Sequence, residues 1–122
     1  MKEKFYFCKG CNAVLMSMDE NPGECCANEL QELIPGTVDA SREKHVPQYE
    51  VRDSKVFVNV GSVSHPMTQE HYIPWVCLYT NQGCQMKRLS CTDKPELCFA
   101  LSEGEKVEAV YAYCNLHGLW KS

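Results

Sequence analysis

Nine cysteines in a chain of 122 residues constrain this protein more than any other feature of its sequence. In a secreted chain of this size, such a density indicates a disulfide framework. The residues before Cys8 contain no apolar stretch of signal-peptide length, and no apolar run in the chain approaches the roughly 18–20 residues that span a bilayer. We therefore expect a cytoplasmic protein without a membrane partner, in which clustered cysteines bind metal.

Four of the cysteines form a first candidate metal site. Cys8 and Cys11 are separated by two residues, and Cys25 and Cys26 are adjacent. Four soft sulfur ligands this close in sequence suit a tetrahedral zinc or iron ion, and the spacing leaves the choice between the two metals open. A zinc ion with a purely structural role, or a disulfide pair, is the alternative interpretation.

Pro35-Gly36 divides the chain into two predicted domains, residues 1–36 and 37–122. The first is too short to bury enough apolar surface to fold alone, so we expect a small unit held together by its metal. Within it we expect a strand near residues 4–7, a second apolar segment at residues 13–18 and a turn at residues 21–23. For residues 28–33 the alternative is a single helical turn.

The second domain has a β pattern. Residues 55–60 alternate in a way that places Val56, Val58 and Val60 on one face, and residues 72–80 and 107–113 are also rich in β-forming residues. In the last segment Val107, Ala109, Tyr111 and Tyr113 are expected on one side. Turn signals separate these segments at intervals typical of a sandwich. We expect an all-β protein whose second domain is an immunoglobulin-like antiparallel β-sandwich.

The charge of the chain argues against a nucleic-acid partner. Lysine and arginine number 12 against 16 acidic residues, which gives a formal net charge of −4. The largest basic cluster is Lys87-Arg88. A phosphate-binding surface requires a more strongly basic patch than this.

Three further blocks contain all four histidines and the last cysteine: EKHVP at residues 43–47, HPMTQEH at 65–71 and CNLHGLW at 114–120. Together they resemble the superoxide reductases. With the four amino-terminal cysteines included, the chain is similar to the two-iron form of that family, desulfoferrodoxin, over essentially its whole length.

The chemistry of these side chains agrees with the resemblance. Four imidazoles and one thiolate can surround an iron ion as a square pyramid and leave one position for a ligand. His65 and His71 lie on either side of the Pro66-Met67 turn, so one loop can direct both rings to a common centre. Cys114 and His117 are three residues apart, before Gly118.

The resemblance implies specific roles. His45, His65, His71 and His117 are the equatorial ligands of a catalytic iron, and Cys114 is its axial ligand. Glu43 occupies the open position in the oxidised resting state, and Lys44 attracts superoxide and helps to deliver protons. Cys8, Cys11, Cys25 and Cys26 bind a second iron in a desulforedoxin-like domain, with zinc as the alternative in that site.

The activity implied is the one-electron reduction of superoxide to hydrogen peroxide, as a detoxification reaction in an anaerobic or microaerophilic cell. The family also implies a small electron donor such as rubredoxin, and a homodimer. Two other classes of function remain open from the residues: a zinc-bound regulatory or binding module, and an electron-transfer iron protein with no open coordination position.

The sequence departs from the family pattern in two places. Only thirteen residues separate Cys11 from Cys25, fewer than is usual, and Ala27 stands where glycine is common. A further set of cysteines recurs every seven residues: Cys77, Cys84, Cys91 and Cys98. Because this region is predicted to contain strands and turns, a seven-residue period does not place them together, and we expect ordinary thiols.

Overall fold

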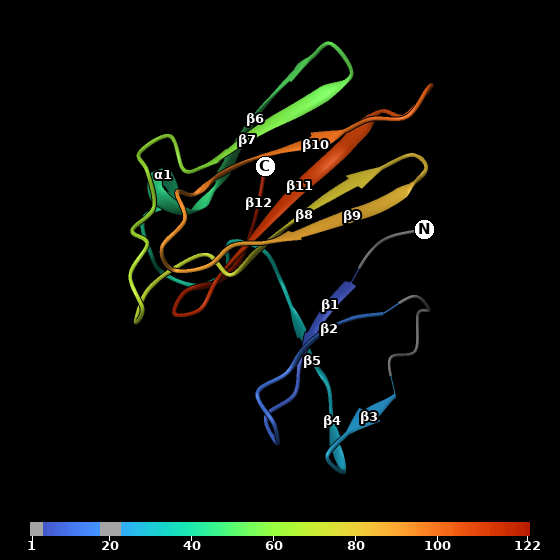
Figure 1. The fold of residues 1–122 in the computed structure, drawn as a ribbon. Coiled ribbons are helices and arrows are strands. Elements are labelled where there is room, and N and C mark those ends of the chain that lie inside the picture. Colours follow the sequence, from blue (N-terminus) through green and yellow to red (C-terminus); the bar gives the residue numbers. More distant parts are fainter. Residues whose placement is uncertain (1–3, 18–22) are drawn as a thin grey trace. The chain divides into compact units, whose positions relative to one another are not determined.

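A computed structural model describes residues 4–17 and 23–122, and the chain divides into two compact units, Met1–Ile34 and Pro35–Ser122 (Figure 1). Nearly all of the regular structure is antiparallel strand, and one short helix is present among the described residues. The expected all-β class is therefore confirmed. No helix in the described part of the chain has the length and hydropathy needed to cross a bilayer.

The first unit contains five short strands. They are β1 (Lys4–Phe7), β2 (Val14–Ser17), β3 (Glu24–Cys25), β4 (Asn28–Glu29) and β5 (Gln31–Leu33). Strand β1 lies between β2 and β5 in one antiparallel sheet, and β3 pairs with β4 in a separate hairpin. The turn expected at residues 21–23 lies largely outside the described residues.

The helical turn offered for residues 28–33 is wrong, because these residues form β4 and β5. One isolated helical turn fixes several dihedral angles for a single hydrogen bond. In β5 the same backbone pairs along β1 instead, with Leu33 opposite Phe5 and Gln31 opposite Phe7. Strand β1 is therefore the hydrogen-bonding partner of β5, and the local sequence of residues 31–33 could not predict this pairing.

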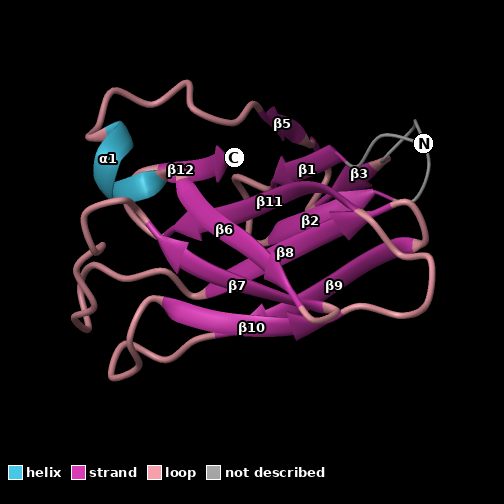
Figure 2. Ribbon diagram, turned by 90° about the horizontal axis from the view of Figure 1, so that it is seen from above, coloured by secondary structure: helices cyan, strands magenta, loops and turns pink. Residues whose placement is uncertain are grey.

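The second unit contains one helix and seven strands. They are α1 (Arg42–His45), β6 (Pro47–Arg52), β7 (Lys55–Val60), β8 (Trp75–Thr80), β9 (Gly83–Arg88), β10 (Glu96–Ala100), β11 (Val107–Cys114) and β12 (Gly118–Lys121). One sheet has the order β10-β7-β6 and the other β12-β11-β8-β9. The two sheets form two layers (Figure 2), as expected for an antiparallel β-sandwich.

The core lies between these two sheets. Val56, Val58 and Val60 are fully buried in it, as their alternation predicts. In β11 the alternation is interrupted by a register shift between Val107 and Ala109. The residues that pack against the core are Val107 before the shift and Val110, Ala112 and Cys114 after it. The expectation that Val107 and Ala109 share one side is therefore wrong. The shift matters because it directs Cys114 inward.

One end of the sandwich carries α1 and the connections that follow β7 and β11, on the left in Figures 1 and 2. The sequence contains no periodic signal for α1, which has only four residues. The loop between β7 and β8 spans residues 61–74, and the turn between β11 and β12 spans residues 115–117. The residues of the second candidate site come from these three segments.

Candidate metal centres

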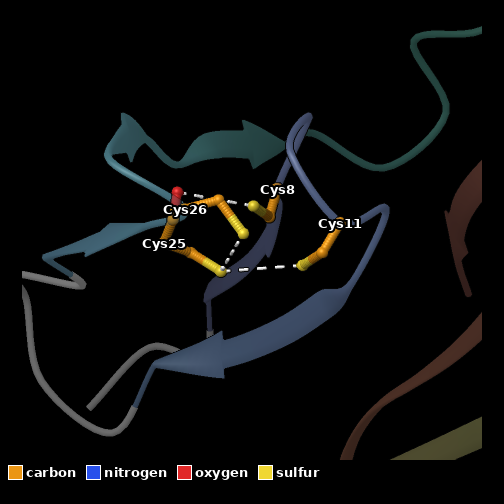
Figure 3. A group of neighbouring side chains, drawn as sticks. All are labelled: Cys8, Cys11, Cys25 and Cys26. Atoms are coloured by element: carbon orange, nitrogen blue, oxygen red, sulfur yellow. Dashed lines mark hydrogen bonds between the residues drawn. The ribbon is translucent and has the colours of Figure 1, made fainter.

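The four amino-terminal cysteines converge in the structure (Figure 3). Cys8 follows β1, Cys11 lies in the turn after it, and Cys25 and Cys26 lie at the end of β3 and in the turn to β4. Their sulfur atoms all lie within 4.8 Å of one another. The Cys11 Sγ is 3.7 Å from the Cys25 Sγ, which is 3.9 Å from the Cys26 Sγ.

These separations fit one tetrahedral ion. At a metal–sulfur distance of about 2.3 Å, the edge of a regular tetrahedron of sulfur atoms is about 3.8 Å. The thiols also perturb one another. Hydrogen bonding with Cys25 lowers the pKa of Cys8 to about 7, while Cys8 and Cys11 raise the pKa of Cys25 to about 12. Since one thiolate opposes ionisation of the next, a cation at the centre is what allows all four to be thiolates.

Adjacent cysteines reach this centre only through an unusual backbone. Cys26 and Ala27 both have left-handed conformations, with φ of 53° and 57°. Neighbouring side chains of an extended strand point to opposite faces, so this turn is what brings Cys25 and Cys26 to the same side. Ala27, the position where glycine is common in the family, thus has a conformation that glycine adopts without strain.

The second group collects the predicted histidines and Cys114. His45 ends α1, His65 and His71 lie in the β7–β8 loop, Cys114 ends β11, and His117 lies in the turn before β12. Ligand atoms of His45, His65, His71 and Cys114 all lie within 4.8 Å of one another. His117 joins them from one side, with its Nδ1 3.1 Å from His45 Nε2 and 3.7 Å from Cys114 Sγ.

Two of these rings have an assigned tautomer. Nδ1 of His45 lies 2.6 Å from the Ser41 carbonyl oxygen, and Nδ1 of His65 lies 2.7 Å from the Pro66 carbonyl oxygen. Because a carbonyl oxygen only accepts, each Nδ1 carries the proton and donates it. In the neutral rings both Nε2 atoms are therefore bare acceptors, and they lie only 3.2 Å apart. Two facing lone pairs repel unless a cation lies between them.

The other ligands fit the same cation. Nε2 of His71 is a buried nitrogen with no hydrogen-bond partner, and a buried polar atom of this kind is costly unless it binds something. Burial lowers the pKa of His45 and His71, and lowers that of His65 to about 4. These imidazoles are consequently neutral near pH 7, which is the form that binds metal.

The Cys114 sulfur is buried and accepts hydrogen bonds from the backbone. The amide of His117 donates to Sγ at 3.4 Å, and the amide of Leu116 also donates to it. Burial raises the pKa of the Cys114 thiol, while the two amides act in the opposite direction. The amides disperse the negative charge of a thiolate, so the pocket is prepared for an ionised sulfur ligand next to a cation.

Gly61 determines how closely α1 approaches the β7–β8 loop. Its φ is +87°, and a Cβ there would lie 2.3 Å from the Val63 carbonyl oxygen and 2.7 Å from those of Glu43 and Lys44. The Val63 amide and the Ser62 hydroxyl both donate to the Glu43 carbonyl oxygen. Glycine at this position therefore allows the helix that carries His45 to contact the loop that carries His65.

Sequence reasoning predicted the backbone amides of Leu116 and His117 as donors to the Cys114 sulfur, but it did not identify Trp120, Ser41 or Gly61 as supporting residues. Trp120 is fully buried, its ring centroid lies 4.9 Å from that of His45, and its Nε1 donates to the His117 carbonyl oxygen. The only signal was its position in the block CNLHGLW. Ser41 and Gly61 gave no signal, because their contributions come from backbone atoms and from the absence of a side chain.

Glu43 and Lys44 are exposed on α1, beside His45. Burial is the main cause of the lowered pKa of His45 and His71, and the positive charge of Lys44 adds a smaller effect in the same direction. Its ammonium group is therefore close enough to act on the cluster of imidazoles. The Glu43 backbone holds the loop, as described above, and its side chain faces solvent.

The remaining cysteines are dispersed: Cys77 is on β8, Cys84 on β9, Cys91 in a turn and Cys98 on β10. Among the residues that the structure describes, neither group that could hold a metal includes any of them.

Comparison with known proteins agrees with this geometry. Residues 37–122 match the family model described as desulfoferrodoxin. The desulfoferrodoxin of Syntrophotalea carbinolica is 42% identical over 123 residues, which cover 99% of this chain and 96% of that protein. The superoxide reductase of Pyrococcus horikoshii is 38% identical and covers 66% of this chain and 84% of its own length.

Among solved structures, the superoxide reductase from Treponema pallidum matches with a TM-score of 0.87 and 42% identity, over 100% of this chain and 99% of that one. The relatives from Syntrophotalea carbinolica and Treponema pallidum span nearly the whole chain, and the family model matches the second unit. The chain therefore belongs to the desulfoferrodoxin family of oxidoreductases.

Proposed function

We propose that this chain is a superoxide reductase whose catalytic iron is bound by His45, His65, His71, His117 and Cys114. The observation that carries the proposal is that unprotonated imidazole nitrogens lie close together beside one cysteine sulfur, which accepts hydrogen bonds from backbone amides. A set of nitrogen ligands with a single sulfur differs from the all-sulfur site of the first unit. Membership of the desulfoferrodoxin family supports the same metal and reaction.

The reaction combines one superoxide anion, one electron and two protons to give hydrogen peroxide. A ferrous ion held by these residues would supply the electron, and an external donor would restore it. With neutral imidazoles and one thiolate, the ligands would leave a ferrous centre with a net charge of +1. Such a centre attracts an anion even though the whole chain carries −4.

Lys44 has two parts in this proposal: it attracts superoxide to the site and, with water, delivers protons to the product. Its support is its exposure on α1 together with its electrostatic effect on His45 and His71. On the family resemblance alone, Glu43 would occupy the remaining coordination position of an oxidised iron held by these residues. The thiolate of Cys114 would donate electron density to the metal, and the hydrogen bonds from the amides of Leu116 and His117 would moderate that donation.

We further propose a domain assignment: residues 1–36 form a desulforedoxin-like unit and residues 37–122 form the catalytic domain. Cys8, Cys11, Cys25 and Cys26 bind a second iron, with zinc as the alternative. Two sulfur–sulfur separations close to the edge of a regular tetrahedron, and the convergence of all four sulfur atoms, support a single ion in that unit. A rubredoxin-like electron donor and a homodimer complete the proposal on the basis of the family.

The test combines metal analysis with rapid mixing. Purified chain should contain two iron atoms, or one iron and one zinc. After anaerobic reduction and mixing with superoxide, we expect one hydrogen peroxide for each superoxide consumed and no dioxygen. Dismutation would instead give half an equivalent each of peroxide and dioxygen. Release of dioxygen, or a ferrous site that superoxide does not oxidise, would contradict the proposed activity.

A further inference from the structure

Asn115, directly after Cys114, connects two of the segments that form the histidine–cysteine site. Its side-chain Oδ1 accepts the Tyr72 amide at 2.9 Å, and its Nδ2 donates to the Glu70 carbonyl oxygen at 2.9 Å. Its own backbone amide donates to the Tyr72 carbonyl oxygen at 3.2 Å. Three hydrogen bonds thus link the residue after Cys114 to the two residues that flank His71.

This link acts on His71, whose hydrogen bonds in the structure are made by its backbone. The rings of His45 and His65 are each held by a bond from Nδ1 to a carbonyl oxygen. The bonds that locate His71 involve its backbone: its amide and carbonyl group both bond to Thr68 within the same loop. Thr68 closes the loop on itself, and Asn115 ties the loop to the strand that carries Cys114.

We propose that Asn115 is a positioning residue that sets the placement of His71 relative to the Cys114 sulfur. The inference rests on the metal site of the proposed function. An amide suits this place because it offers one acceptor and one donor to two backbone groups two residues apart. Aspartate keeps the acceptor for Tyr72 but presents a second oxygen to the Glu70 carbonyl oxygen, and alanine removes both bonds.

The chain contains a matched control for this arrangement. Asn81 makes the same three bonds at the other end of β8: its amide donates to the Lys106 carbonyl oxygen, its Oδ1 accepts the Lys106 amide at 2.7 Å, and its Nδ2 donates to the Gly104 carbonyl oxygen at 3.1 Å. The six residues of β8 separate the two links by about 20 Å. Both asparagines are exposed, so their replacement removes equivalent bonds.

The experiment titrates metal-free full-length protein with Co²⁺ against a competing chelator, for the wild type and the variants Asn115→Ala, Asn115→Asp and Asn81→Ala. The thiolate-to-cobalt charge-transfer absorption measures cobalt binding at each site, and the four-cysteine site serves as the internal reference. The denaturant midpoint of each chain is measured separately.

We expect Asn115→Ala to weaken cobalt binding at the single-thiolate site at least about tenfold, in the range found when partners of metal ligands are removed. Its absorption band should also shift, with Asn115→Asp intermediate. Asn81→Ala should lower the denaturant midpoint comparably while both cobalt affinities stay at their wild-type values. If Asn115→Ala does not fold, the comparison of Asn115→Asp with Asn81→Ala replaces it.

Equal cobalt affinities and band positions in the Asn115 and Asn81 variants would overturn the positioning role and leave the metal site standing. A wild-type chain with no single-thiolate cobalt band would overturn the metal site itself, and the positioning role with it. The two failures are therefore distinguishable by the wild-type titration.

Discussion

Two adjacent residues in the four-cysteine site, Cys26 and Ala27, have left-handed backbone conformations. For a residue with a Cβ this conformation costs about 1–2 kcal/mol. The cost at Cys26 accompanies the turn that brings its sulfur to the other three. The side chain of Ala27 does not belong to this group of sulfur atoms, so a substitution that removes the strain at Ala27 leaves the group intact.

We predict that Ala27→Gly stabilises the amino-terminal unit by about 0.5–1 kcal/mol, since relief of the strain exceeds the added flexibility of the unfolded chain. The measurement is the denaturant concentration at which the absorption of the four-thiolate metal is lost. Ala13→Gly is the control, because Ala13 lies outside the left-handed region and should lose about 0.5–1 kcal/mol. A decrease in stability for Ala27→Gly would show that the turn is not strained.

A second residue-scale prediction concerns Lys44. We expect Lys44→Gln to slow the second-order reaction with superoxide by several-fold to about tenfold, and to make the rate less sensitive to ionic strength. Stopped-flow rates at several salt concentrations measure both effects. Lys55→Gln, which removes an exposed charge at the start of β7, should change neither. Identical salt dependence in the wild type and Lys44→Gln would contradict the steering role.

At the scale of elements, the contact between α1 and the β7–β8 loop depends on Gly61. We predict that Gly61→Ala destabilises the second unit by at least about 1–2 kcal/mol and weakens metal binding at the histidine–cysteine site. Its Cβ would collide with three backbone carbonyl oxygens, so α1 must move away from the loop. Denaturant unfolding and metal competition measure the two effects.

The matched control is Gly104→Ala. Gly104 has a similar φ of +76°, but the nearest atom to its added Cβ is a flexible Gln82 side-chain nitrogen at 3.7 Å. This variant carries the conformational strain without the collision and should keep the wild-type metal affinity. Equal metal affinities in the two variants would mean that the Gly61 contact does not position His45.

The turns at the other end of the sandwich depend on Glu105. Its carboxylate accepts the hydroxyl of buried Thr80 at 2.6 Å and the amide of Ser102 at 2.9 Å. Both bonds hold the pKa of Glu105 below its ordinary value, and the bond from Thr80 has the larger effect. The unfolded chain therefore binds more protons at this group than the folded chain does, and stability rises with pH in that range.

We predict that this contribution is complete above the ordinary glutamate pKa of about 4.3 and is lost as pH falls through the lower pKa of the folded state. Glu105→Gln should destabilise the protein near pH 7, and the difference from the wild type should shrink in acid. Urea unfolding across pH measures it, with Glu108→Gln as the control for loss of an exposed charge. A difference that is constant with pH would contradict the role of the carboxylate.

The strands that sequence predicted best are those whose burial alternates without interruption. Val56, Val58 and Val60 are an example, because β7 lies between β6 and β10 with one face on the core. The bulge between Val107 and Ala109 could not be predicted, since it results from pairing with β8. Helix α1 is too short for periodicity, and β5 depends on its pairing with β1.

For the whole molecule, the candidate metal ligands were accessible from sequence because each needs a particular side-chain chemistry at a particular spacing. All of them converge in one of two groups. The supporting residues Asn115, Trp120 and Gly61 act through long-range contacts with Tyr72, His45 and Glu43. Such contacts exist only in the folded chain, so no local sequence pattern predicts them.

The most direct test of the central claim is a crystal structure of the iron-loaded protein with anomalous diffraction measured at the iron edge. In the second unit we expect an iron peak bonded to Nε2 of His45, His65 and His71, to Nδ1 of His117 and to Sγ of Cys114, with one coordination position not filled by these five side chains. An iron bound by only some of these residues, or a Cys114 sulfur directed away from the imidazoles, would contradict the account.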